Sequence, residues 1–297
     1  MNATIDPNIR TVTVVGVGLL GGSIGLAIRA GGSSAKIVGV GRRQTSLDEA
    51  LQVGAVDEVC LNVAEGVAGA DLVILATPVG AFNRLLTAAK DALKPGAIVT
   101  DVGSTKAEIV AQGEKVLSPG GPFIGSHPMA GSEHRGPTFA RADLFTGATC
   151  ILTPTGNTPP ELAERAQRFW QALGMRVVRM SPADHDQAVA RISHLPQVLA
   201  SLLMQLPSDS DLDIAATGFR DSTRLAGSDP EMWRDIIMTN RQPVLAAIET
   251  MTGELRHMAG LIEAGDADAI EQLLASAKQR RLDTIGRKLT DRRISAE

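Results

Sequence analysis

The sequence predicts an α/β protein: a doubly wound, mostly parallel sheet followed by a smaller all-helical domain. Apolar, β-rich runs alternate with helical stretches over residues 11–180, and a glycine-rich turn joins the first run to the first helix. No strand-like run follows residue 180. The chain has 297 residues, which is enough for two domains of ordinary size. We expect these domains to be residues 1–181 and 182–297.

The strands of the first domain are predicted where short apolar runs are bounded by glycine or proline. Helices are expected between these runs, including residues 23–30 and 160–173. Buried runs separated by helices are typical of parallel βαβ units, so we expect one continuous sheet. The predicted strands are residues 11–15, 35–40, 71–76, 97–102, 122–125, 149–153 and 175–180.

The second domain is predicted to be helical throughout. Residues 182–206 have helical periodicity, and the pair 229–230 is a strong helix start, an N-cap acid followed by proline. Apolar residues keep helical spacing from 232 to 262, with a kink expected at Pro243. Residues 265–266 are expected to end this helix and begin the last one.

The composition excludes several classes of function. The formal net charge is −4 and no Lys/Arg cluster is long, which argues against nucleic acid or an anionic membrane as the main partner. Cys60 and Cys150 have no metal-ligand spacing and form no disulfide framework, so we expect no metal site and a reducing, cytoplasmic location. Residues 12–28 are uncharged, but they are short for a membrane span and contain five glycines, so we expect neither export nor insertion.

Residues 16–21, GVGLLG, follow a predicted strand and open a predicted helix. A dinucleotide-binding (Rossmann-type) fold requires this context, with the pyrophosphate over the helix N-terminus. The alternative is a tight turn that binds nothing. The positions expected to contact the cofactor here are Gly16, Gly18, Leu19, Leu20 and Gly21.

The residues after the second strand bear on the choice of cofactor. An NAD site places Asp or Glu there to hold the ribose hydroxyls, whereas this chain has Gly41, Arg42 and Arg43. Because the planar arginine fork suits a phosphate, we expect NADP, with NAD the less expected cofactor. The alternative is a pair of solvated surface arginines.

In an open α/β sheet, ligands bind beyond the carboxyl ends of the strands. Thr77 and Pro78, Ser104 and His127 each follow a predicted strand, so we expect all of them to face the same crevice as the glycine loop. His127 is expected in a turn directly after its strand. It can accept a proton near neutral pH, as the general base for oxidation of an alcohol must, and Ser104 would orient it. The alternative is a structural turn histidine.

The second domain offers one histidine and two arginines as site candidates. His194 is either a site residue or a buried, satisfied histidine beside a proline. Arg220 and Arg224 lie one turn apart if a helix forms locally, and together they would bind a carboxylate. We interpret the remaining histidines as polar surface positions: His134, His185 and His257.

Together these residues resemble the prephenate/arogenate dehydrogenase family of tyrosine biosynthesis. The matching segments occur in the family's order over most of the chain, and the last three are specific to the family. They are GVGLLGGS (16–23), DVGSTK (101–106), GSHPMAGSE (125–133), SPADHDQAV with ISHLP (181–196) and GFRDSTRLAGSDPEMWRDI (218–236).

The resemblance implies oxidative decarboxylation of a cyclohexadienol that carries a ring carboxylate, giving a phenol. It implies that His127 takes the ring-hydroxyl proton and that Ser104 hydrogen-bonds this hydroxyl or His127. Arg224 would hold a substrate carboxylate, and His194 would line the pocket from the helical domain. A homodimer through the helical domain is also implied, and we expect it to involve residues about 230–290.

Two departures from the family pattern narrow the expectation. Many prephenate-specific relatives carry a second histidine just after SHLP, where this chain has Gln197. With the arginines after the second strand, this substrate-site residue makes the chain resemble the NADP-dependent arogenate type. The chain also ends after the helices, so we expect neither a fused mutase nor a C-terminal regulatory domain.

L-Arogenate is therefore the expected substrate, with prephenate as a lesser or equal one. The first alternative is an NAD-dependent prephenate dehydrogenase. A β-hydroxyacid or imine reductase normally relies on a lysine on a helix of its second domain, and none is evident between residues 181 and 277. The alternative from another class is a non-catalytic NADP-sensing protein, which has no need for Ser104, His127 and Arg224 together.

Overall fold

The computed structural model describes residues 4–132 and 134–294, and the side chains of its last helix up to residue 284. The chain divides into two compact units, Met1–Arg241 and Gln242–Glu297. The first unit contains the whole described sheet together with the helices that follow it as far as residue 241. The domain boundary expected at residues 181 and 182 coincides with the end of the strands and otherwise stays a prediction.

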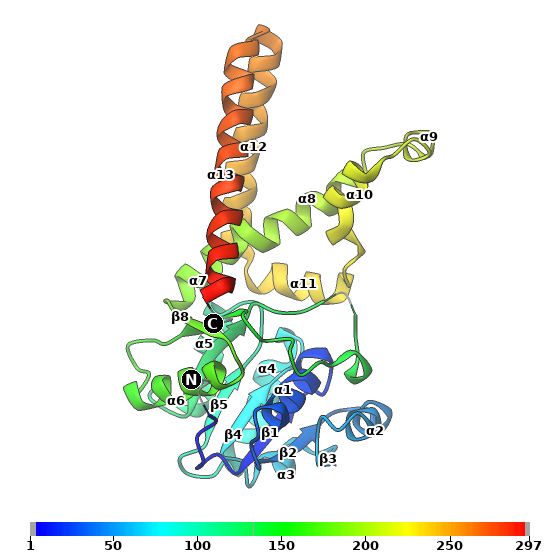
Figure 1. Cartoon of the computed structure of the whole chain (residues 1–297). Coiled ribbons are helices and arrows are strands. Elements are labelled where there is room, and N and C mark those ends of the chain that lie inside the picture. The colour runs from blue at the N-terminus through cyan, green and yellow to red at the C-terminus, as the bar shows by residue number, and fades with distance from the viewer. Residues whose placement is uncertain (1–3, 133, 295–297) are drawn as a thin grey trace. The chain divides into compact units, whose positions relative to one another are not determined.

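The described strands form one sheet with the order β3-β2-β1-β4-β5-β6-β7-β8 (Figure 1). Neighbouring strands are parallel except β6 and β7, which are antiparallel. The strand order reverses beside β1, which confirms the doubly wound, mostly parallel sheet. The strands are β1 (Thr11–Val15), β2 (Lys36–Val40), β3 (Glu58–Cys60), β4 (Leu72–Leu75), β5 (Ile98–Asp101), β6 (Phe123–Pro128), β7 (Thr149–Thr153) and β8 (Arg176–Arg179).

Helices pack on both faces of the sheet and enclose it between two apolar cores. Successive residues of a strand point to opposite faces, and β1 follows this rule. Val12 and Val14 belong to the core that includes α1 and α6, whereas Val15 belongs to the core that includes α4. The helices among the strands are α1 (Leu19–Ala30), α2 (Gln44–Gln52), α3 (Val63–Val67), α4 (Phe82–Ala89), α5 (Ala107–Leu117) and α6 (Pro160–Ala172), with short 3₁₀ turns η1 (Val79–Ala81), η2 (Lys90–Ala92) and η3 (Pro137–Phe139).

β3 is the strand that the sequence pattern did not predict. It has three residues at the edge of the sheet, and none of them is buried. An edge strand of this length contains no apolar run, so hydrophobic periodicity cannot reveal it.

β6 is longer than predicted and includes His127. Its first residues, Phe123 and Ile124, pair with parallel β5, and its remaining residues pair with antiparallel β7, where His127 lies opposite Ile151. The second partner strand therefore prolongs β6 past the point where the first one stops. The expectation that His127 lies in a turn after the strand is wrong, because the residue is part of the sheet.

Residues 182–241 are helical, as predicted, and no described strand follows β8. Ser181 and Asp229 cap two of these helices, accepting backbone N–H bonds from Asp184 and Met232. The elements are α7 (Pro182–Val189), a π-helical turn η4 (Ala190–His194), α8 (Leu195–Leu203), α9 (Asp209–Leu212), α10 (Thr217–Thr223), a 3₁₀ turn η5 (Arg224–Gly227) and α11 (Pro230–Thr239).

The second unit consists of α12 (Arg241–Ala264) and α13 (Ala267–Ile294). The chain reverses at Gly265, whose φ of 68° favours glycine, as expected. The kink expected at Pro243 is wrong: the helix breaks at Asn240, and Pro243 falls in the first turn of α12, where its missing N–H costs nothing. Among the described residues, no helix has the length and apolar character needed to cross a membrane.

Candidate active site

The glycine loop between β1 and α1 is built for close approach to a ligand. Gly16 has a φ of +102°, and a Cβ added to it would lie 2.5 Å from the carbonyl oxygen of Ala76. A Cβ on Gly21 would lie 2.0 Å from the carbonyl oxygen of Gly16. Gly18 is the N-cap of α1, and no side chain caps that helix. Its first N–H groups, from Leu19 and Leu20 onward, therefore point to a site that suits a phosphate anion.

Thr77 and Pro78 lie beside this loop, at the carboxyl end of β4. The missing Cβ of Gly16 would be 2.8 Å from Cγ2 of Thr77, so the two segments are in contact. The hydroxyl of Thr77 is buried and has no hydrogen-bond partner among the described residues. A buried hydroxyl without a partner at this point fits a bound nucleotide, as the glycine loop does.

Gly41, Arg42 and Arg43 follow β2 directly and lead into α2. A side chain at position 41 would crowd Leu47, whose Cδ2 would be 3.1 Å from the added Cβ. Both arginines are exposed, and neither forms an ion pair within the described part of the chain. Two guanidinium groups without an ion-pair partner among the described residues thus follow β2, at the place where an NAD site has an acidic residue.

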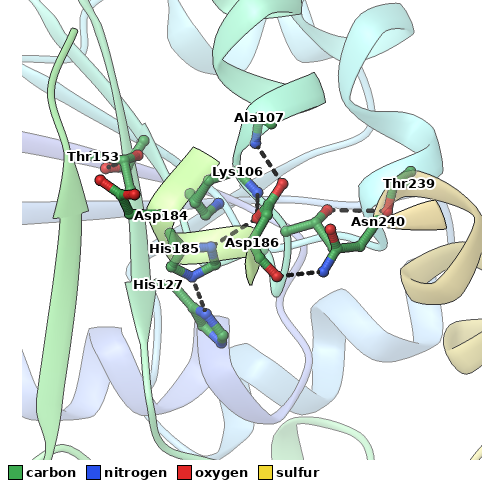
Figure 2. A network of polar contacts seen from close by, with 12 residues as sticks. Lys106, Ala107, His127, Thr153, Asp184, His185, Asp186, Thr239 and Asn240 are labelled. Carbon is green, nitrogen blue, oxygen red and sulfur yellow. Dashed lines mark hydrogen bonds and ion pairs between the residues drawn. The ribbon is translucent and has the colours of Figure 1, made fainter. Parts of the chain in front are cut away.

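His127 is hydrogen-bonded to a second histidine that sequence reasoning missed. Its Nδ1 lies 2.8 Å from Nε2 of His185, and Nδ1 of His185 lies 2.8 Å from Oδ1 of Asp186 (Figure 2). The interpretation of His185 as a surface residue is wrong, because the residue is fully buried. A histidine between two aspartates on a helix has the pattern of a solvated face, and the packing of α7 against α5, β7 and His127 of β6 buries it.

The hydrogen-bond directions fix the proton positions on both rings. Asp186 accepts backbone N–H bonds from Lys106 at 2.7 Å and from Ala107 at 2.8 Å, so its carboxylate acts as an acceptor. Nδ1 of His185 must then donate to Asp186, which leaves its Nε2 as an acceptor in the neutral ring. His127 therefore donates from Nδ1 and carries a bare Nε2. This nitrogen is the one that can act as a base.

Asp186 joins several elements as well as orienting His185. Its two backbone bonds cap the N-terminus of α5, and its own carbonyl oxygen accepts a bond of 2.8 Å from the amide of Asn240. Beneath it, the ammonium group of Lys106 forms a fully buried ion pair with Asp101. The helices after the sheet are thus tied to the carboxyl ends of β5 and β6, where His127 lies.

The electrostatic surroundings keep His127 neutral. Burial lowers the pKa of His127 well below its usual value, and the nearby His185 and Lys106 lower it further. Burial also lowers the pKa of His185, but Asp186 opposes this shift by stabilising the protonated ring. A neutral His127 has the protonation state that a base needs before the reaction begins.

His194 occupies the last position of η4, the π-helical turn between α7 and α8. Such turns are frequent at functional sites because they displace one side chain from the regular helix. Asn240 lies 3.0 Å from Nδ1 of His194, and the ring meets Trp233 edge-on with centroids 5.8 Å apart. Burial lowers the pKa of His194 to about 4, so this ring is neutral as well.

The other predicted site residues have different surroundings. Ser104 is half-buried in the segment after β5, and its hydroxyl makes no hydrogen bond among the described residues; the orienting partner of His127 is His185. Gln197 is buried in the first turn of α8, and no residue that the structure describes forms a hydrogen bond with its Oε1. Arg220 and Arg224 are exposed on α10 and at the start of η5, which packs against α8.

The described residues contain no group of histidine, cysteine and acidic side chains that would hold a metal ion. The chemistry available here comes from one bare histidine nitrogen, a half-buried hydroxyl, unpartnered amide oxygens and exposed arginines. Together with a nucleotide loop at the same sheet edge, this set suits proton abstraction from a polar substrate. Glu133, the last residue of the third family-like segment, lies outside the described residues.

Comparison with known proteins gives matches along most of the chain. The family model "Prephenate dehydrogenase, nucleotide-binding domain" matches residues 24–179, and "Prephenate dehydrogenase, dimerization domain" matches residues 181–276. A prephenate dehydrogenase of Bacillus subtilis is 34% identical over 278 residues, which are 91% of this chain and 75% of that protein.

Two crystal structures share the fold at similar identity. Prephenate dehydrogenase from Aquifex aeolicus, in complex with hydroxyphenyl propionate and NAD+, is 32% identical with a TM-score of 0.88, covering 93% of this chain and 98% of that one. Arogenate dehydrogenase from Synechocystis is 32% identical with a TM-score of 0.80, covering 92% and 99%.

Proposed function

The chain belongs to the prephenate/arogenate dehydrogenase family, and from that premise we propose that it converts L-arogenate to tyrosine with NADP. Prephenate, which would give 4-hydroxyphenylpyruvate, is the second substrate that we propose. Family membership supports the general activity: the protein is a nicotinamide-dependent enzyme that catalyses an oxidative decarboxylation in tyrosine biosynthesis. The substrate and the cofactor are the finer choices, and each has support in particular residues.

The bare Nε2 of His127 is the observation that carries the proposed chemistry. The substrate hydroxyl would give its proton to this nitrogen while C4 of the ring loses a hydride. The ring carboxylate then leaves as CO2, and the electron pair of the broken C–C bond completes the aromatic ring. When bound, the nicotinamide accepts the hydride. Ser104, whose hydroxyl has no partner among the described residues, is proposed to orient the substrate hydroxyl.

Buried acceptors support arogenate over prephenate. Oε1 of Gln197 is buried and has no hydrogen-bond partner among the described residues, and Gln197 lies one helical turn after His194. An unsatisfied buried acceptor favours a ligand that donates, and the side-chain ammonium of arogenate is such a donor. The keto group of prephenate has no hydrogen to offer there. Arg224 is proposed to bind a carboxylate of either substrate, and His194 to line the pocket.

The two free arginines after β2 support NADP. Arg42 and Arg43 are exposed, without an ion-pair partner among the described residues, and Gly41 removes the acid that would repel a 2′-phosphate. We propose that Gly16, Gly18, Leu19, Leu20 and Gly21 bind the pyrophosphate and that Thr77 and Pro78 contact the same cofactor. The competing pair is prephenate with NAD, since one similar enzyme binds NAD+ in its crystal structure.

A homodimer is proposed from the second unit and from the family. The matched model is described as a dimerization domain. On α12, Leu255 and Ile262 are 60% and 63% exposed and lie two turns apart on one face. A cytoplasmic location, expected from the cysteine content, stays a prediction.

The decisive experiment pairs each substrate with each cofactor. Purified protein is mixed with arogenate or prephenate and with NADP or NAD, and kcat/KM is followed by the absorbance of the reduced cofactor. We expect the highest value for arogenate with NADP. A higher value for prephenate with NAD would reverse both finer choices. NADP binding without turnover of either substrate would favour the non-catalytic NADP-sensing alternative.

A further inference from the structure

We propose that His185 and Asp186 form a buried relay that sets the proton position on His127 and receives the positive charge that forms there. His185 and Asp186 are positioning residues in this scheme, since they act through His127. The catalytic part of the inference rests on the proposed function, in which His127 is the base. The tautomer part concerns the protein alone and holds for any substrate.

The three side chains form one continuous, buried chain of contacts. The exposed fractions are 9% for His127, 0% for His185 and 2% for Asp186. The two rings meet edge-on with centroids 5.1 Å apart, and both hydrogen bonds in the chain are 2.8 Å long. Each nitrogen of His185 therefore has one partner, and no freedom remains for its ring to turn or change tautomer.

The backbone anchors the far end of the relay. Asp186 accepts N–H groups from Lys106 and Ala107 at the start of α5, so both of its oxygens are fixed. A neutral histidine in water prefers the proton on Nε2, which would leave His127 without a base directed away from His185. The carboxylate reverses this preference through His185, because among the described residues Nδ1–H of His127 is the only donor within hydrogen-bond distance of Nε2 of His185.

The same contacts supply a path for the second half of the proton transfer. When the substrate O–H bond breaks, a new N–H bond forms at Nε2 of His127. The Nδ1–H bond of His127 can then break while an N–H bond forms at Nε2 of His185. The positive charge thereby moves to the ring beside the Asp186 carboxylate, and no proton leaves the buried chain.

Neighbouring charges favour His185 as the final holder of the proton. Asp186 raises the pKa of His185 against the effects of burial and Lys106, whereas burial, His185, Lys106 and His194 all lower the pKa of His127, and no described residue opposes them. Lys106 is itself paired with Asp101. The titratable groups that face the histidine pair from the surrounding elements are Asp101, Lys106, Cys150, Asp186 and His194.

The test begins with the wild-type protein labelled with 15N in its histidines, of which there are five. At neutral pH we expect the ring nitrogens of His127 to report a protonated Nδ1 and a bare Nε2. During an acid titration we expect the first proton of the pair to appear on His185. A protonated Nε2 on neutral His127, or a first proton on His127 with His185 neutral, would overturn the relay.

Two substitutions separate the relay from a merely structural role. His185→Gln places an amide oxygen near the position of Nε2, so His127 should keep its Nδ1–H tautomer, although no proton can pass onward. His185→Met fills similar volume and replaces the nitrogen acceptor by a thioether sulfur, which accepts only weakly, so His127 should change to the Nε2–H tautomer. We expect kcat to fall about 10-fold in the first and about 10²–10⁴-fold in the second, the range for losing a correctly prepared base.

The control substitution is His257→Gln, at an exposed position on α12, which should leave the tautomer of His127 and kcat unchanged. If His127 keeps its tautomer and kcat is unchanged in His185→Met, the proposal is overturned. If that variant does not fold, a change of the His127 tautomer in His185→Gln would overturn it. If the wild type turns over neither arogenate nor prephenate, the proposed function is wrong. The 15N spectra of the histidines still test the tautomer part of the relay in that case.

Discussion

Asn240 binds two acceptors with one nitrogen: its Nδ2 lies 3.0 Å from Nδ1 of His194 and 2.8 Å from the carbonyl oxygen of Asp186. The carbonyl can only accept, which fixes the orientation of the amide. Nδ1 of His194 is therefore also an acceptor, and the proton of this neutral ring is on Nε2. His127 and His194 thus have opposite tautomers, so one offers an acceptor and the other a donor.

The neutral state of His194 predicts how stability depends on pH. Burial lowers the pKa of His194 to about 4 in the folded protein, whereas in the unfolded chain this histidine titrates at its ordinary pKa of 6.5. Above pH 6.5 neither state is protonated, and the contribution to stability is complete. As the pH falls toward 4, the unfolded chain gains a proton that the folded protein does not take up. The free energy of unfolding should drop by about 3 kcal/mol over this range.

The measurement is urea unfolding at several pH values between 4 and 7, in wild type and in His194→Gln. The variant should lose part of the slope, while the buried His127 and His185 keep a slope of the same sign. An equal replacement at the exposed His134 is the matched control and should leave the slope unchanged. Identical slopes in wild type and His194→Gln would show that this ring is not held neutral.

His127→Asn should fold and bind cofactor but lose most turnover. The Asn amide nitrogen takes the place of Nδ1 and still donates to His185, so the buried network survives while the bare Nε2 is gone. Removal of a general base costs about 10²–10⁴-fold in kcat. Fluorescence titration with the cofactor measures binding, and initial-rate assays at saturating substrate give kcat. Near-normal kcat at neutral pH would remove His127 from the mechanism.

Arg224→Ala should raise KM far more than it lowers kcat. A substrate carboxylate is bound in the ground state and in the transition state alike, so the loss is uniform. A charge-assisted contact of this kind should change KM about 10- to 100-fold. Arg220→Ala removes a second exposed arginine one turn away, and its KM is compared with that of Arg224→Ala. If KM for arogenate and prephenate is unchanged in Arg224→Ala, this residue does not touch them.

The protein should be a homodimer at micromolar concentration, and charges on α12 should dissociate it. Ile248, Leu255 and Ile262 recur every seven residues and so share one face, and the last two are strongly exposed in the single chain. Light scattering should give twice the chain mass for wild type and a shift toward the monomer for Leu255→Glu with Ile262→Glu. His257→Gln should remain dimeric. A monomeric wild type would contradict the proposed interface.

Most of the sheet was predictable because its central strands, such as β4 and β5, are buried on both faces. Continuous apolar runs such as residues 72–75 carry that burial in the sequence itself, and the glycine loop adds φ and close-packing requirements that only glycine meets. β3 has only three residues at the edge of the sheet, which is too short for an apolar run, so it left no pattern. The end of β6 depended on pairing with β7, about 25 residues later, which local patterns cannot register.

The site, like the sheet, has residues that the sequence predicted and residues that it did not. The glycines after β1 and the histidine after residues 123–126 follow from a rule about strand ends, so the sequence predicted their neighbourhood. His185 and Asn240 were missed, because each is polar, lies in a stretch with a helical pattern, and is buried against residues that are distant in the sequence. Their role comes from a hydrogen-bond network, which has no sequence period.

The cofactor preference depends on two arginines and an absent acid. Gly41 stands where an NAD site needs a carboxylate, and Leu47 leaves little room for a side chain at that position. Arg42 and Arg43 are exposed and unpaired among the described residues, so no internal partner competes with a phosphate. A 2′-phosphate offers the acceptor geometry that a guanidinium fork binds.

Arg42→Ala should therefore lower kcat/KM for NADP and leave that for NAD nearly unchanged. One phosphate contact of this kind implies roughly 10- to 100-fold in kcat/KM in favour of NADP. Because both arginines are exposed, added salt should shrink the preference in wild type. Arg43→Ala is the matched comparison and should have the same effect more weakly. The measurement is kcat/KM for both cofactors at saturating substrate, at low and high salt. Equal use of NAD and NADP by wild type would mean that the arginines are only solvated surface groups, and the choice of the arogenate type would then depend on Gln197 alone.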